Sequence, residues 1–150
     1  GLDKPLEPPW PNLREAYFLL RERWSRNFEQ LGLSFSDYVV LDLCARGLAR
    51  ASDVARAIGI TAAGATDVID RLEGRRLVRR VADPKDRRAV HIRLTAAGQR
   101  LYRAARLSNR ATKKGLDDAM SVAERRALTS GLIALTRALR QVTQAMRGGS

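Results

Sequence analysis

Hydrophobic positions recur every three or four residues along most of the chain, which is the period of an amphipathic helix. The first such stripe occupies residues 12–32, after an opening segment that holds four of the five prolines. Because proline is disfavoured inside helices, we expect residues 1–11 to form an extended arm, with Asn12 capping the first helix. A second buried helix is expected to open at Ser36 and to stop at Gly47.

Two short helices are predicted next, over residues 50–58 and 61–74, with Gly59 between them. Two short helices joined by a tight turn that contains glycine are typical of a helix-turn-helix. The period then changes to the alternation of a β-strand within residues 77–94, interrupted by a polar turn at residues 83–86. This pattern predicts a two-stranded hairpin with a charged tip.

Two longer helices are expected to complete a mainly α fold. One opens at Thr95 and fades near Gly115, and Ser121 with Glu124 fits a capping box that opens the other. Apolar residues of the last helix follow the 4, 3, 4, 3, 4 spacing of a heptad seam, which needs a partner helix. They are Leu128, Leu132, Leu135, Leu139, Val142 and Met146. We therefore expect one domain over residues 12–146 and a flexible tail over 147–150.

The charge of the chain points to an anionic partner. Its 150 residues are 45% hydrophobic, enough for the core of one domain, and carry 28 Lys and Arg against 16 Asp and Glu, for a net charge of +12. Residues 71–93 hold nine basic and three acidic side chains, so that nine minus three, or +6, falls on the predicted helix-turn-helix and hairpin. A helix there fits the major groove of DNA, and arginines at a hairpin tip can enter the minor groove.

Several other classes of protein do not fit the sequence. The one cysteine excludes an intrachain disulfide framework, and Cys44 with His91 cannot complete a structural zinc site. No apolar run approaches the roughly 18 residues of a membrane helix, and no signal-peptide pattern is present, so we expect a cytoplasmic protein without membrane contact. No phosphate loop or catalytic constellation stands out, so we expect neither an enzyme nor a cofactor. Cys44 lies among apolar residues, which favours core packing over oxidant sensing.

The run DPKDRRAVHIRLTAAG at residues 83–98 closely resembles the wing signature of the MarR family of bacterial and archaeal transcription regulators. Residues 70–73 and 77–80 look like the end of that family's recognition helix and its first wing strand. Residues 33–41 resemble its second helix.

The resemblance implies a winged helix-turn-helix homodimer. Residues 33–94 would form the DNA-binding lobe, and residues 12–32 with 95–146 would form the dimerisation helices. The partner would be double-stranded DNA at a pseudo-palindromic operator, with the protein acting as a repressor that a small effector releases. The expected dimer contacts are Leu13, Tyr17, Leu128, Leu132, Leu135, Leu139 and Val142.

The same resemblance assigns candidate DNA contacts. The recognition helix falls on residues 61–73, with Thr61, Ala62, Ala63, Gly64, Thr66, Asp67 and Arg71 as candidates. The DNA-facing end of this helix departs from the family's commoner Ser-, Thr- and Arg-rich form. Direct recognition of bases would therefore depend on Thr66, on apolar contact with thymine methyl groups and on close approach of the backbone. Arg87 corresponds to the family's minor-groove arginine, beside Lys85 and Arg88. Further phosphate contacts are expected from Arg50, Ser52 and Arg75.

Carboxylates in this region are expected to shape the wing. Asp83 and Asp86 at a DNA-facing tip would repel phosphate, unless they hold neighbouring arginines such as Arg87 in position. Asp70 and Arg71 either tie the recognition helix to the wing or contact DNA, and the sequence leaves both open.

By the resemblance, a pocket for a small effector lies between the dimerisation helices and the DNA-binding lobe. Trp24, Phe28 and Tyr38 could line it, with Arg14 or Arg21 facing an aromatic or phenolic anion. The alternative is that this aromatic stripe belongs to the core or to the dimer interface.

Two rival functions remain open. The high charge and the plain recognition helix also suit an architectural protein that coats DNA without sequence preference. A protein-interaction module that uses only the terminal helices would bind no duplex. The ratio of affinity for an operator to affinity for random duplex DNA distinguishes both rivals from a regulator.

Overall fold

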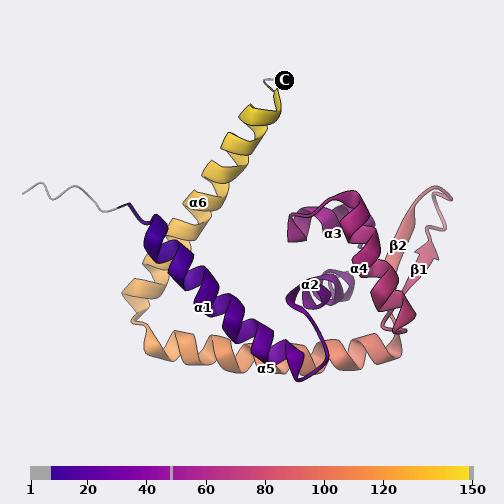
Figure 1. Cartoon of the computed structure of the whole chain (residues 1–150), viewed down its shortest axis with the longest axis horizontal. Helices are drawn as coiled ribbons and strands as arrows, with labels where there is room; N and C mark the ends of the chain where they lie inside the picture. The colour runs from indigo at the N-terminus through magenta and orange to yellow at the C-terminus, as the bar shows by residue number, and fades with distance from the viewer. Residues whose placement is uncertain (1–7, 48, 149–150) are drawn as a thin grey trace, which may run out of the picture. The chain divides into compact units, whose positions relative to one another are not determined.

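The computed structural model describes residues 8–47 and 49–148, and it confirms a mainly helical fold with one two-stranded hairpin in those ranges (Figure 1). The chain divides into two units, Gly1–Arg110 and Ala111–Ser150. None of the described helices is both long and apolar enough to cross a membrane. The elements are, in chain order, α1 (Trp10–Glu29), α2 (Phe35–Ala45), α3 (Ala51–Ile58), α4 (Ala62–Gly74), β1 (Val78–Ala82), β2 (Val90–Leu94), α5 (Ala96–Ala119) and α6 (Val122–Gly148).

The first helix begins earlier than the sequence indicated. Asn12 does not cap α1, which begins at Trp10 after Pro9 and carries Pro11 in its first turn. Proline is tolerated there because the first amides of a helix have no intrahelical acceptor. Residues 1–7 of the expected arm lie outside the described residues.

The second helix is capped by Ser34 and not opened by Ser36. The Asp37 amide donates to the Ser34 hydroxyl at 3.0 Å, and the Asp37 carboxylate accepts from the Ser34 amide at 2.9 Å. This reciprocal pair satisfies two amides that would otherwise lack acceptors, so the spacing of three residues selects Ser34.

The core of the first unit surrounds α2, which contacts α1, α3, α4 and β2. Its largest fully buried side chains include Phe28, Leu41, Ile69 and Leu72. Cys44 is also buried, and desolvation raises the pKa of its thiol to about 12. The prediction that Cys44 packs in the core is confirmed.

The predicted hairpin is present as an antiparallel pair, with Val78 opposite Leu94 and Ala82 opposite Val90. At its base, the Thr95 hydroxyl donates to the Arg76 carbonyl at 2.6 Å, and it accepts from the Gly98 amide at 3.0 Å. These bonds join the end of the hairpin to the first turn of α5.

Beyond Arg110, α5 continues to Ala119 and does not fade at Gly115. Lys114 and Asp118 form an ion pair one turn apart on this stretch, which offsets part of the cost of a glycine inside a helix. The predicted capping box of α6 is present, with Ser121–Glu124 bonds of 2.8 and 3.1 Å.

Candidate nucleic-acid interface

A tight turn joins α3 to α4. Gly59 ends α3 with φ +73°, a left-handed conformation that glycine adopts without strain. Two residues later Thr61 caps α4, since its hydroxyl accepts from the Gly64 amide at 3.1 Å. At the start of α3, the Asp53 carboxylate accepts from the Arg50 amide at 2.9 Å, and this bond is the main cause that lowers the pKa of Asp53. The sequence predicted both helices, the glycine that ends the first and the threonine that caps the second.

The N-terminal half of α4 presents small side chains to solvent. Ala62, Ala63, Thr66 and Asp67 are exposed, and Gly64 is half-buried. The opposite side of the helix is buried through Ala65, Ile69 and Leu72. Apart from Arg71, the residues of α4 that the resemblance assigned to DNA contact therefore share an accessible surface at the start of the helix, near its capping residue Thr61.

Two of the arginines expected to contact DNA, Arg71 and Arg75, lie beside a buried carboxylate. Asp37 is only 3% exposed, its Oδ1 accepts from the Arg71 guanidinium, and its Oδ2 lies 3.8 Å from Nη1 of Arg75. The cluster connects the start of α2 to the C-terminal half of α4. Arg71 therefore joins α4 to α2 and not to the wing.

Arg80 of β1 links the wing to α4. Its guanidinium donates to Asp70 at 2.6 Å and to Glu73 at 2.7 Å, and its amide donates to the second oxygen of Glu73 at 3.0 Å. Asp70, together with Glu73, thus ties the helix to the wing, which was one of the two roles left open for Asp70. Sequence reasoning missed Arg80 because several neighbouring arginines look alike in a charge pattern.

The charged tip of the hairpin is ordered through backbone amides. Asp83 accepts from the Lys85 amide at 2.8 Å, and Asp86 accepts from the Arg88 amide at 3.0 Å. Asp86 was expected to orient arginine side chains, but its short side chain reaches the nearer amide. Lys85, Arg87 and Arg88 are exposed, and among the described residues their side chains form no ion pair.

His91 is a structural residue of the wing that sequence reasoning considered only as a metal ligand. It is 4% exposed, and its Nε2 lies 2.8 Å from Oδ2 of Asp83. This hydrogen bond is the main cause that lowers the pKa of Asp83. The pair spans from β2 to the turn and so holds the tip against its own strand.

A hollow of about 490 Å³ lies against α1 and the start of α2. Two of the five expected pocket residues, Arg21 and Trp24, line it. Arg14 does not, while Phe28 is fully buried and stacks on Tyr38 with ring centroids 4.5 Å apart. For Phe28 and Tyr38 the core alternative is therefore the better description. The remaining lining residues are Tyr17, Ser25, Glu29, Leu33, Ser34, Phe35, Ser36 and Ile58.

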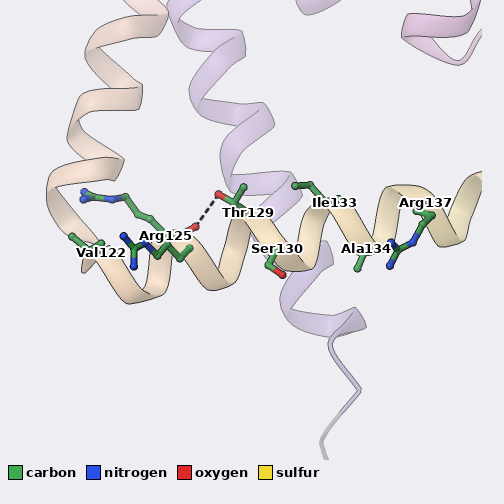
Figure 2. A pocket seen from close by; sticks show the side chains of 8 residues that line it. Val122, Arg125, Thr129, Ser130, Ile133, Ala134 and Arg137 are labelled. Atoms are coloured by element: carbon green, nitrogen blue, oxygen red, sulfur yellow. Dashed lines mark hydrogen bonds between the residues drawn. The ribbon is translucent and has the colours of Figure 1, made fainter.

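The residues expected in a dimer interface lie on accessible surfaces. On α1, Leu13 is 38% and Tyr17 is 56% exposed. No described residue of α6 is buried, and its heptad residues Leu128, Leu132 and Leu139 remain about half exposed. A second hollow runs along one side of the same helix, between Val122 and Arg137, with arginines and Ile133 on its walls (Figure 2).

Together, α3, the turn, α4 and the hairpin define a winged helix-turn-helix. Figure 1 shows α3 and α4 beside each other and the hairpin following α4. The second helix of the motif leads directly into the wing, and the Arg80 clamp fixes the two against each other.

Comparison with known proteins narrows this class. The sequence model of the MarR family matches residues 31–89. The uncharacterized HTH-type transcriptional regulator YfiV of Bacillus subtilis (strain 168) is 31% identical over 101 residues, which cover 67% of this chain and 63% of that relative. These matches place the segment at residues 31–89 in the MarR family.

Solved structures share the fold. BpsR of Bordetella bronchiseptica is 28% identical, with a TM-score of 0.74 over 91% of this chain and 98% of its own. That structure is described as showing how 6-hydroxynicotinic acid regulates DNA binding by BpsR. AbsC, a MarR family transcriptional regulator from Streptomyces coelicolor, is 24% identical and has a TM-score of 0.81 over 94% of this chain and 98% of its own. The AbsC likeness is one of fold.

Proposed function

We propose that this chain is a homodimeric transcription regulator that binds a pseudo-palindromic operator in double-stranded DNA and represses transcription from the neighbouring promoter. The observation that carries the proposal is the joint presentation of two accessible surfaces, the start of α4 and the basic tip of the hairpin. The first suits a major groove, and the second suits the narrower minor groove beside it.

The charge distribution supports a nucleic acid as the partner. Arg71, Arg75 and Arg80 have carboxylate partners within the protein, whereas Lys85, Arg87 and Arg88 have none among the described residues. The tip therefore carries three cations without an ion-pair partner among the described residues, and guanidinium groups there favour the negative potential of a minor groove. Arg50 and Ser52, both exposed at the start of α3, are further candidates for phosphate contact.

The apolar stripes of α1 and α6 support a homodimer. A seam of leucines at heptad spacing that stays half exposed is the surface a second helix would cover. A two-fold dimer would present two α4 helices to successive major grooves, with half-sites about one helical turn, roughly 10 bp, apart.

The hollow beside α1 and α2 is the candidate site for an effector. Arg21, Trp24 and Phe35 all line this hollow, so it offers a positive charge and aromatic surface to an aromatic anion. The regulation of BpsR by a hydroxylated aromatic acid makes this class of ligand the first to test.

The test of the proposed function is a mobility-shift titration with DNA from upstream of the protein's own gene, in the presence of excess random duplex and over a salt series. A regulator should hold the cognate duplex roughly a thousandfold or more tighter than the competitor. Binding that random duplex abolishes would favour the rival function, an architectural protein that coats DNA. The absence of any binding would favour an interaction module.

A further inference from the structure

Polar side chains are scarce on the accessible part of α4. Of its exposed residues before Asp70, Ala62 and Ala63 carry no side-chain hydrogen-bonding group, and only Thr66 and Asp67 do. Any direct hydrogen bond from a side chain in this part of the helix to a base edge must therefore come from these two residues.

Thr66 has already used its donor. Its hydroxyl donates to the carbonyl oxygen of Ala62 at 3.1 Å, one turn back along the helix. A hydroxyl group has one hydrogen, so toward an external ligand Thr66 presents only the lone pairs of its oxygen and its methyl group.

Asp67 can also only accept while it is ionised. Its carboxylate makes no hydrogen bond or ion pair with any described residue, in contrast to Asp70, which Arg80 holds at 2.6 Å. The adjacent cation, Arg71, is engaged by Asp37. Asp67 is therefore an exposed, uncompensated negative charge on the helix that would face an anionic polymer, and such a carboxylate opposes binding unless it meets a donor.

The major groove offers such donors at two bases. Cytosine presents its N4 amino group and adenine its N6 amino group, whereas guanine presents only the acceptors N7 and O6. A carboxylate, which only accepts, is complementary to an amino group, and it repels the major-groove edge of guanine.

We propose that Asp67 is a specificity-determining residue whose carboxylate accepts a hydrogen bond from the exocyclic amino group of cytosine or adenine and disfavours guanine at that position. The inference rests on the proposed function, because it requires α4 to enter a major groove. It assigns to each half-site one base position that depends on a single side chain.

The experiment starts from the duplex that the wild-type protein selects out of a random pool. Fluorescence anisotropy then gives the affinity for this duplex and for duplexes in which each half-site position carries each of the other three base pairs. We expect one position at which an amino base is preferred over guanine by roughly tenfold or more, as for a good base contact. Asp67→Ala should bring that ratio close to one and leave the ratios at the other positions unchanged.

Asp67→Asn distinguishes the two amino bases. An asparagine amide both donates and accepts, and it pairs with N6 and N7 of adenine. If the native contact is adenine, the variant should retain the preference, and if the contact is cytosine, the preference should move from cytosine to adenine.

Glu15→Gln is the matched control, because it removes one negative charge from an exposed position on α1. It should change affinity for all duplexes by a common factor and leave every ratio intact. Ratios that stay unchanged in Asp67→Ala, in a protein that still selects a site, would overturn this inference alone. A wild-type protein that selects no site would overturn the proposed function and this inference with it.

Discussion

Gly98 fixes the distance between the hairpin and α5 at the scale of a single residue. A Cβ atom at this position would lie 1.9 Å from the carbonyl oxygen of Leu77, closer than any real contact. The same carbonyl accepts from the Thr95 amide at 3.1 Å, so the backbone cannot move away without losing that bond. Glycine is therefore required by close packing and not by an unusual backbone angle.

Replacement of Gly98 by alanine should lower the free energy of unfolding by about 1–3 kcal/mol, the usual range for overpacking. Gly115→Ala is the matched control, because its Cβ would meet nothing within 4 Å. Gly115 lies inside α5, so alanine there should stabilise by up to about 1 kcal/mol. Urea denaturation followed by circular dichroism measures both changes, and equal midpoints for Gly98→Ala and wild type would contradict the packing argument.

Cys44 should behave as a core residue and not as a redox sensor. Since burial raises the pKa of its thiol to about 12, very little thiolate exists near neutral pH, and a disulfide reagent at pH 8 should label the native protein far more slowly than the unfolded chain. The unfolded thiol loses its proton near pH 9.0. The stabilisation by the neutral buried thiol is therefore complete below pH 9 and is lost as the pH rises from 9 toward 12. Rapid native-state labelling would contradict this.

At the scale of elements, the wing is held at both of its ends. Arg80 ties β1 to Asp70 and Glu73 on α4, while the Asp83–His91 hydrogen bond ties the tip to β2. Exposed ion pairs contribute little to stability individually, so we interpret the Arg80 clamp chiefly as a device for orientation. Together these restraints fix the hairpin that carries the cations Lys85, Arg87 and Arg88 at its tip.

Arg87→Ala should weaken binding to the operator by about 1–3 kcal/mol, with altered sequence preference at the flanks of each half-site. If Arg87 replaces counterions on the DNA, the slope of log affinity against log salt should also fall by about one. Arg103→Ala on the exposed side of α5 provides a control of equal charge. A folded Arg87→Ala protein with unchanged affinity and slope would contradict the assignment to the minor groove.

For the whole molecule, we expect the apolar heptad residues of α6 to form the dimer interface. Leu139 is 57% exposed and lies in the heptad series, so an aspartate there would place a charge in the interface of a dimer. The molar mass measured by light scattering should then fall from that of a dimer to that of a monomer. Affinity for the operator should also fall, because a monomer has one DNA-binding lobe and contacts one half-site. Gln144→Asp on the opposite side of α6 should remain dimeric. A wild-type monomer at micromolar concentration would contradict the proposed assembly.

Local signals in the sequence predicted the elements, whereas long-range pairs had to come from the structure. The Thr61 cap, the Ser121–Glu124 box and the hairpin are each encoded within a few residues. The Asp37–Arg71 pair joins positions 34 residues apart, and no periodicity indicates which arginine a buried carboxylate will meet. The prolines near the N-terminus predicted that the first helix begins after residue 11. It begins at Trp10, because the first turn of a helix accepts proline.

Hydroxyl-radical footprinting on the selected duplex tests the central claim most directly, because it reports where the two lobes lie on the DNA. A dimeric winged-helix regulator should protect two half-sites about one helical turn apart, with added protection in the flanking minor grooves that Arg87→Ala removes. The boundaries should stay fixed as protein concentration rises. Protection without a fixed position, which lengthens with concentration, would contradict the account and favour an architectural coat.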